Sequence, residues 1–125
     1  MIGAGSMGAQ IAQQAALHGV EVWLQDVSSE SLERAVASNR GHLDRRVDKG
    51  RMSRDDAETA LARVNTTTEL DAAVAGADFV IEAVFEDLDV KRTTFAALDR
   101  TAPPSAVLAS NSSTIGISKL AEATS

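Results

Sequence analysis

Hydrophobic and polar residues follow two kinds of pattern that take turns along the chain. One pattern predicts strands and the other predicts helices. Short runs rich in apolar or β-branched residues are typical of strands, and longer segments with apolar residues every three or four positions are typical of helices. We predict strands at 21–25, 65–68, 78–84 and 106–109. We predict helices over 10–17, 69–75, 88–98 and 117–123. This alternation favours an α/β fold, a parallel sheet with helices on both faces.

Two further helices are predicted between Ser28 and Val64. The first has a serine cap at Ser28 or Ser29, and its buried face is expected to carry Leu32, Val36, Asn39, Leu43 and Val47. After a break at Gly50, the second is capped by Ser53 with Asp56 as its partner, and its inner face is expected to carry Ala57, Leu61 and Val64. The pair is longer than a plain crossover needs. It is therefore either an arm that stands off the sheet or an ordinary surface insertion.

Residues Gly3 to Gly8 match the spacing G-x-G-x-x-G. Such a turn bends tightly at the first glycine, admits a pyrophosphate at Gly5 and brings the next helix close to the sheet at the third. The start of that helix offers free N–H groups and a partial positive charge to a phosphate. The segment predicts a dinucleotide-binding turn that includes Ser6 and Met7, and a purely structural turn is the alternative.

Asp26 closes the strand that follows, at the place where a dinucleotide-binding fold has a carboxylate for the adenosine ribose. A carboxylate there accepts hydrogen bonds from ribose hydroxyls and repels a 2′-phosphate. The turn, the helix and Asp26 together predict NAD, in preference to NADP, as the cofactor. A surface aspartate beside a structural turn is the alternative.

Only Met1 and Ile2 precede the turn, although this motif ordinarily follows a strand at the centre of the sheet. We therefore expect a Rossmann-type doubly wound parallel sheet with a helical arm after the second strand and with the first strand largely missing. The strand ending at Asp26 is then expected to have an exposed edge. On this interpretation residues 1–125 are an incomplete NAD-binding domain, either a fragment or the product of a misassigned start codon.

The composition excludes several other classes of protein. The formal net charge of −6 disfavours a nucleic-acid partner. The chain has no cysteine, which excludes disulfides, thiolate metal sites and a cysteine nucleophile, and which suits a reducing cytoplasm. His18 and His42 lack partners at ligand spacing, so we expect no metal. No apolar run approaches the roughly 18 residues of a membrane helix, so we expect no membrane partner.

Three stretches carry a pattern that is more specific than the glycines alone. They are Gly-Ala-Gly-Ser-Met-Gly-Ala-Gln-Ile-Ala-Gln at Gly3–Gln13, Asp-Phe-Val-Ile-Glu-Ala-Val-Phe-Glu-Asp-Leu-Asp-Val-Lys at Asp78–Lys91, and Leu-Ala-Ser-Asn-Ser-Ser at Leu108–Ser113. In these stretches the chain resembles the NAD-binding domain of the L-3-hydroxyacyl-CoA dehydrogenases. That family oxidises the 3-hydroxyl of a fatty acyl-CoA by hydride transfer to NAD, and it acts in fatty acid β-oxidation.

The resemblance implies roles for residues outside the glycine turn. Glu86 and Lys91, with Ala83 and Val84 before them, would lie along the cofactor toward its nicotinamide end. A solvated helix start is the competing interpretation for Glu86 and Lys91. Ser113 matches the serine that hydrogen-bonds the reacting oxygen of the substrate, although this chain has serine at 112 and threonine at 114 where the family more often has the reverse. Ser112 or Ser113 could instead cap the following helix.

Three expectations concern the substrate and the intact enzyme. Lys49 occupies the place of a family lysine near the CoA phosphates, and a solvated lysine is the alternative. The general base of the family is a histidine in a Gly-Leu-His-Phe-Phe-Asn-Pro stretch that would follow Ser125, and neither His18 nor His42 can replace it. The family's helical C-terminal domain, which completes the substrate cleft and forms a homodimer, is also absent from these residues.

The sequence therefore predicts the NAD-binding part of a cytoplasmic 3-hydroxyacyl-CoA dehydrogenase. Because a positioned base contributes about 10²- to 10⁴-fold to such a reaction, we expect residues 1–125 alone to bind NAD weakly and to be inactive. Two alternatives remain open. One is a dehydrogenase of a free hydroxy acid or of carnitine on the same fold, and the other is an NAD-binding module without catalysis.

Overall fold

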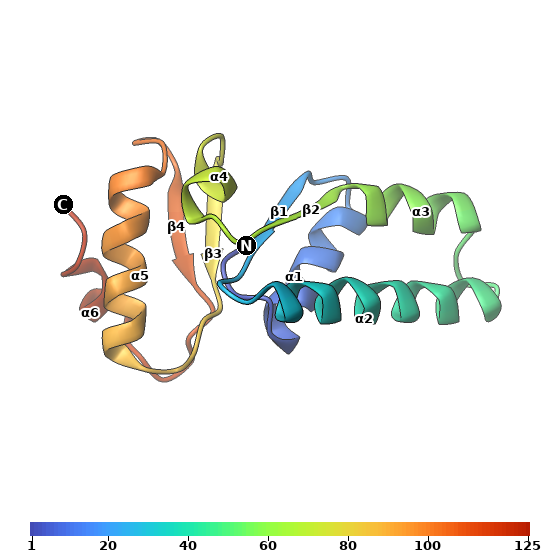
Figure 1. Cartoon of the computed structure of the whole chain (residues 1–125), viewed down its shortest axis with the longest axis horizontal. Coiled ribbons are helices and arrows are strands. Elements are labelled where there is room, and N and C mark those ends of the chain that lie inside the picture. The colour runs from blue at the N-terminus through green and yellow to red at the C-terminus, as the bar shows by residue number, and fades with distance from the viewer.

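The computed structural model describes the whole chain, residues 1–125, as helices alternating with parallel strands (Figure 1). The helices are α1 (Ser6–Leu17), α2 (Ser29–Asp48), α3 (Arg54–Ala62), α4 (Leu70–Val74), α5 (Leu88–Thr101) and α6 (Ile117–Ala121). The strands are β1 (Val22–Gln25), β2 (Val64–Thr67), β3 (Phe79–Glu82) and β4 (Val107–Ser110). Each strand and helix predicted from the sequence is present, with shifted ends.

The sheet consists of two parallel ladders that meet at Ile2. One ladder pairs β1 with β2 and the other pairs β3 with β4. Ile2 forms parallel bridges to Gln25 of β1 and to Glu82 of β3. Its N–H donates to the carbonyl of Ile81 at 2.9 Å. The spatial order is therefore β2, β1, Ile2, β3, β4, and a single residue represents the first strand of the predicted Rossmann sheet.

Helices cover both faces of the sheet, as a doubly wound fold requires. On one face α1 and the first half of α2 pack on β1 through small and branched side chains that include Ala9, Ala12, Leu24 and Leu32. On the other face α4 and α5 pack on β3, and their cluster includes Ile2, Val74, Val80 and Leu98. The alanines of α1 let that helix approach the strands closely, which holds the glycine turn against the sheet.

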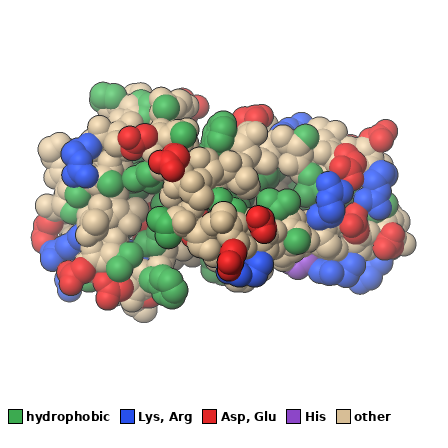
Figure 2. All heavy atoms as spheres, viewed as in Figure 1, with side chains coloured by type: hydrophobic (Ala, Val, Ile, Leu, Met, Phe, Trp, Pro, Cys, Tyr) green, Lys and Arg blue, Asp and Glu red, His purple; other side chains and the backbone are tan.

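Helices α2 and α3 form an arm that extends away from the sheet, so the first of the two alternatives for this insertion is confirmed (Figure 1). Its core is Leu43 with Ala57 and Ala60, each buried. Arg40 and Glu58 form an ion pair of 2.9 Å across the two helices. Figure 2 shows charged side chains of both signs crowded over this end of the molecule. Because exposed ion pairs contribute only about 0–1 kcal/mol, the small apolar core holds the arm together.

Three details of the predicted burial were wrong. Val36 is 42% exposed, and Ala35 takes its place on the buried stripe of α2 because the close contact with α1 accepts only a small side chain. Val64 belongs to β2 and not to α3, which ends at Ala62. Phe79 is 55% exposed, although a nearly continuous apolar run such as 78–84 is typical of a strand that is covered on both faces. Phe79 lies at the start of β3, whereas Ile2 pairs with Glu82 at the end of that strand and does not cover Phe79.

Candidate cofactor and substrate site

The glycine turn lies at the junction of β1, β3 and α1, and each glycine has a distinct steric role. Gly3 has φ +97°, and a Cβ there would lie 2.7 Å from the carbonyl oxygen of Ala83. A Cβ on Gly8 would overlap the carbonyl oxygen of Gly3. A Cβ on Gly5 would meet nothing within 4 Å. The first and third glycines therefore close the turn against the protein, and the second leaves its outer side open.

The N-terminus of α1 opens at the same place. Gly5 is its N-cap residue, and no side chain caps the helix. A pocket of about 250 Å³ adjoins this first turn and is bounded on its far side by α2. Its lining comprises Ala4, Gly5, Ser6, Ala9, Gln10, Ser31, Arg34, Ala35 and Ser38. Unpaired N–H groups at a helix start beside an open glycine are the donors that a diphosphate accepts.

Asp26 lies directly against the glycine turn. Its Oδ2 accepts a hydrogen bond from the N–H of Ala4 at 2.9 Å, and its Oδ1 accepts one from the N–H of Ser28 at 2.9 Å. These two bonds fix the carboxylate at the tip of β1, and each oxygen keeps lone pairs for further donors. A diphosphate at Gly5 and a ribose diol at Asp26 would therefore be neighbours. The residues present therefore fit a dinucleotide, because the Asp26 carboxylate lies beside the glycine turn and not far from it.

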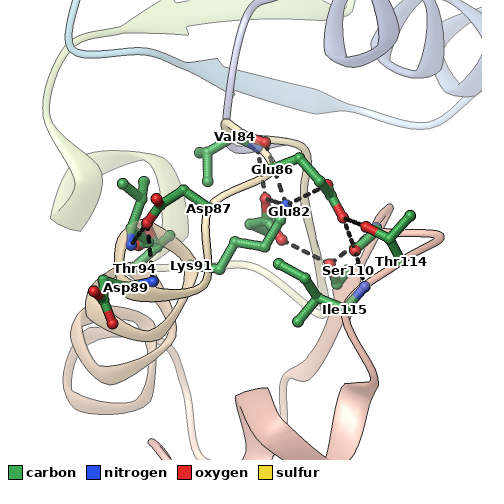
Figure 3. A network of polar contacts seen from close by, with 12 residues as sticks. Glu82, Val84, Glu86, Asp87, Asp89, Lys91, Thr94, Ser110, Thr114 and Ile115 are labelled. Carbon is green, nitrogen blue, oxygen red and sulfur yellow. Dashed lines mark hydrogen bonds and ion pairs between the residues drawn. The ribbon is translucent and has the colours of Figure 1, made fainter.

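A buried ion pair lies beneath the end of β3 (Figure 3). Lys91 of α5 is 1% exposed and Glu82 is fully buried. The ammonium of Lys91 donates to Oε1 of Glu82 at 2.6 Å and to the carbonyl of Val84 at 3.2 Å. Glu82 also accepts from the N–H of Val84 at 2.6 Å and from the hydroxyl of Ser110 at 2.7 Å. The pair thereby fixes residues 83–84 and the end of β4 relative to each other.

Glu86 joins this network to the loop after β4. Its carboxylate accepts from the hydroxyls of Ser112 and, at 2.7 Å, of Thr114, and it lies 3.5 Å from the ammonium of Lys91. The hydrogen bond from Ser112, followed by that from Thr114 and the charge of Lys91, lowers the pKa of Glu86 to about 2. Glu86 is thus an anion at neutral pH, and it holds the segment 112–114 against the end of β3.

Ser113 differs from its two hydroxylic neighbours. Ser112 donates to Glu86 and accepts from the N–H of Ile115 at 2.9 Å, and Thr114 also donates to Glu86. The hydroxyl of Ser113 is exposed and makes no hydrogen bond within the chain. Neither serine caps α6, whose N-cap residue is Gly116. The capping alternative is therefore wrong, and Ser113 is the one hydroxyl of this segment that is free to meet a ligand.

The remaining residues that the sequence assigned to the site lie at different distances from the glycine turn. Ala83 donates its N–H to Ile2 at 2.8 Å and adjoins the turn, and Met7 is 53% exposed on the first turn of α1. Lys49 is exposed at the C-terminus of α2, at the tip of the arm. Helix α2 begins near Asp26 and is about 30 Å long by its 1.5 Å rise per residue. Lys49 is therefore remote from the glycine turn.

The structure contains no cluster of side chains suited to a metal ion. None of its helices has the length and apolar character that crossing a membrane requires.

Glu82 is the functional candidate that the sequence interpretation missed. A glutamate within the apolar run 78–84 was a usable signal, because a charged residue is fully buried only when it is paired. Lys91 lies nine positions later, on the first turns of α5, where a long side chain can reach back to the strand. The sequence assigned Lys91 to the cofactor, whereas in the structure its ammonium is engaged by the protein.

The chain is similar to known proteins over its whole length. Residues 1–125 match the family described as 3-hydroxyacyl-CoA dehydrogenase, NAD binding domain. The chain is 42% identical over 121 residues to 3-hydroxyadipyl-CoA dehydrogenase of Escherichia coli K12, covering 97% of this chain and 25% of that protein. It is 41% identical over 124 residues to 3-hydroxybutyryl-CoA dehydrogenase of Bradyrhizobium diazoefficiens, covering 99% of this chain and 42% of that protein.

Solved structures give the same result for the fold. The crystal structure of (S)-3-hydroxybutyryl-CoA dehydrogenase from Ralstonia eutropha superposes with a TM-score of 0.95 at 37% identity, covering 99% of this chain and 44% of that one. The 3-hydroxybutyryl-CoA dehydrogenase structure from Escherichia coli K12 gives a TM-score of 0.93 at 42% identity, with 96% and 25% covered. The chain thus spans between a quarter and less than half of these relatives. It belongs to the family of the NAD-binding domain of 3-hydroxyacyl-CoA dehydrogenase.

Proposed function

We propose that the chain is the cofactor-binding part of an NAD-dependent dehydrogenase that oxidises the 3-hydroxyl of a 3-hydroxyacyl-CoA. The family match supports the cofactor, and the activities for which the relatives are named support the substrate class. The observation that carries the proposal is the position of Ser113. Its unpaired hydroxyl lies on a loop that Glu86 fixes beside the end of β3, next to the strand position from which the glycine turn starts.

The residues of the chain would share the work of binding and orientation. The amides of the glycine turn and the start of α1 would hold the diphosphate, and Asp26 would accept the ribose hydroxyls. Ala83, Val84 and Glu86 would line the nicotinamide end. Bound NAD supplies a ring that accepts a hydride. Lys91 would act mainly by holding the carbonyl of Val84 and the carboxylate of Glu86 in place, because all its contacts are to the protein.

Ser113 would orient the reacting oxygen of the substrate. A hydroxyl group can donate to a ketone and accept from an alcohol, so one serine can serve both directions of the reaction. No histidine lies near Ser113: His18 ends α1 and His42 lies on the arm. We therefore propose that the general base, together with the helical domain that closes the substrate cleft, lies outside residues 1–125, and that these residues alone are inactive.

Further features follow from the resemblance to the family. We propose that Lys49 at the tip of the arm meets the phosphates of CoA, and that the intact enzyme is a cytoplasmic homodimer that does not bind nucleic acid. The net charge of −6 supports the last point, because an acidic protein repels a phosphate backbone.

A steady-state assay of the intact enzyme that carries this domain tests the proposal. With acetoacetyl-CoA and NADH we expect oxidation of NADH, and with Ser113→Ala we expect kcat/KM to fall by about tenfold to a hundredfold while NADH affinity is unchanged. Ser118→Ala, an exposed serine on α6, is the matched control. Oxidation of NADH with the free 3-keto acid, and none with acetoacetyl-CoA, would show a hydroxy-acid dehydrogenase instead.

A further inference from the structure

The pocket beside the glycine turn extends to side chains of α2 that the binding of NAD does not use. Its lining includes Ser6 and Gln10 from α1, and Ser31, Arg34 and Ser38 from α2. Only three of its nine lining residues are hydrophobic, and all three are alanines. Arg34 is the one charged residue of the lining. A pocket of this kind suits a small anion better than an apolar group, because its walls supply hydroxyl donors and a positive charge.

Hydrogen bonds connect this pocket to Asp26. The carboxylate of Asp26 accepts from the N–H of Ser28, which is the N-cap residue of α2. The hydroxyl of Ser28 accepts from the N–H of Ser31 at 3.2 Å, and the hydroxyl of Ser31 accepts from the guanidinium of Arg34 at 3.0 Å. The first turns of α2 therefore lead from the carboxylate assigned to the ribose to the cation that lines the pocket.

The guanidinium of Arg34 has donors left for a ligand. It has five N–H groups, and one nitrogen donates to Ser31. Its other polar contact is with Glu30 at 3.8 Å, which is longer than a hydrogen bond. The two side chains of this ion pair are 70% and 83% exposed, so the pair contributes little to stability. Arg34 can therefore turn its planar fork toward a phosphate group, which such a fork binds through two parallel hydrogen bonds.

We propose that this pocket receives the 2′-phosphate of NADP, with Arg34 as its counter-ion, so that the domain binds NADP in addition to NAD. The inference rests on the proposed dinucleotide site. A ribose between a diphosphate at Gly5 and the carboxylate of Asp26 has its 2′-position next to the pocket, because Gly5 and Ser31 both line it. An arginine near this carboxylate is the group that accommodates a 2′-phosphate in dinucleotide-binding folds.

Asp26 and Arg34 act on such a phosphate with opposite signs. Two backbone N–H groups hold Asp26 beside the ribose, so its repulsion of a 2′-phosphate remains and NAD stays the tighter ligand. The attraction of Arg34 offsets part of that repulsion, because opposite charges at similar distances cancel. The preference for NAD is therefore moderate, and Arg34 determines its size together with Asp26.

Titration of the 125-residue chain with NAD and with NADP, followed by amide NMR, tests the inference. We expect Arg34→Gln to weaken NADP binding by about tenfold and to change NAD binding by less than about twofold, because only NADP carries the 2′-phosphate. Arg45→Gln is the matched control. It removes the same charge from an exposed residue about 16 Å further along α2, and neither affinity should change by more than about twofold. NADP, but not NAD, should also shift the side-chain Nε–H signal of Arg34.

Several results would overturn the proposal. Equal losses for NAD and NADP in Arg34→Gln would show that Arg34 acts on the part that both cofactors share. Equal losses of NADP affinity in Arg34→Gln and Arg45→Gln would show that net charge alone governs the binding. The nucleotides 2′,5′-ADP and 3′,5′-ADP carry the phosphates of NADP and of CoA, and we expect tighter binding of the first. Tighter binding of the second, dependent on Arg34, would assign the pocket to CoA instead.

The same titrations separate this inference from the proposed function. If neither dinucleotide bound, the proposed cofactor site would be wrong and the inference would fail with it. If NAD bound at the glycine turn but NADP did not bind, or bound without any response to Arg34→Gln, the inference alone would be wrong.

Discussion

The ammonium of Lys91 lies 2.6 Å from Oε1 of Glu82, and solvent reaches almost none of either side chain. The same carboxylate binds the N–H of Val84 and the hydroxyl of Ser110, so one buried group connects α5, the end of β3 and the end of β4. Glu86 lies in the loop between β3 and α5, and Ser113 lies in the loop that follows β4. The positions of Glu86 and Ser113 therefore depend on an ion pair that is buried inside the protein.

Removing only the cation of this pair should destabilise the chain strongly. We expect Lys91→Met to lower the free energy of unfolding by about 3–5 kcal/mol, because it leaves a buried carboxylate without its counter-charge. The double variant Glu82→Gln with Lys91→Met should recover part of that loss, since the neutral amide needs no cation. Urea unfolding measures both. Arg40→Met, which breaks an exposed pair, is the control and should cost less than about 1 kcal/mol. If Lys91→Met and Arg40→Met lowered the free energy of unfolding equally, this role of the buried pair would be contradicted.

The glycine turn permits a comparison of two substitutions with opposite consequences. Gly5→Ala places its methyl group in open space, so stability should stay within about 0.5 kcal/mol of the original. Its affinity for NAD should fall by about tenfold or more, a loss of about 1.4 kcal/mol, because the methyl group stands where the diphosphate approaches. Gly8→Ala overlaps the carbonyl of Gly3, and we expect a loss of about 3 kcal/mol or more in stability. Thermal melts and NAD titrations separate the two effects, and an unchanged affinity for Gly5→Ala would place the diphosphate elsewhere.

Asp26 should select the cofactor. We expect Asp26→Asn to weaken NAD binding by about tenfold, which corresponds to about 1.4 kcal/mol, and to reduce the preference for NAD over NADP. The reason is that an amide accepts at only one atom and does not repel a 2′-phosphate. Titration of the chain with each dinucleotide gives both numbers. Asp71→Asn, an exposed aspartate of α4, is the control, and an effect as large as that of Asp26→Asn would show that net charge alone governs binding.

Glu86 should make the stability of the chain depend on acid pH. Its pKa in the folded chain is about 2, below the ordinary value of 4.5, so the folded state binds fewer protons than the unfolded state between these values. The stabilisation is complete above pH 4.5 and is lost as the pH falls toward 2. We expect Glu86→Gln to flatten this part of the profile of unfolding free energy against pH. Glu33→Gln, which removes an exposed carboxylate without hydrogen bonds or ion pairs, should leave the slope attributable to Glu86 in place.

Local patterns predicted most of the fold. The serine caps at Ser28 and Ser53 are present as hydrogen bonds to residues three positions later, and the α2–α3 break falls at Gly50 with φ +67°. The spacing from the glycines to Asp26 predicted the approach of that carboxylate to the turn. These features depend on neighbours within a few residues or on a motif whose geometry is fixed, so a single sequence reveals them.

Contacts between distant segments were harder to predict. The choice of Ala35 over Val36 for the buried stripe depends on how closely α1 approaches α2, which hydrophobicity does not report. The burial of Lys91 depends on its ion pair with Glu82 of β3, which the sequence interpretation did not anticipate. The resemblance pointed to Ser113, but the difference between its unpaired hydroxyl and those of Ser112 and Thr114 became visible only with the position of Glu86 in three dimensions.

The most direct test of the account is an amide NMR titration of the 125-residue chain with NAD, which detects binding even when it is weak. The account predicts that the largest shifts fall on Gly5, Ser6 and Ser28, with a second group at Val84 and Glu86. It also predicts that the shifts at the turn shrink in Asp26→Asn. Shifts confined to other parts of the chain, or none at millimolar NAD, would contradict the claim that the glycine turn and Asp26 hold the cofactor.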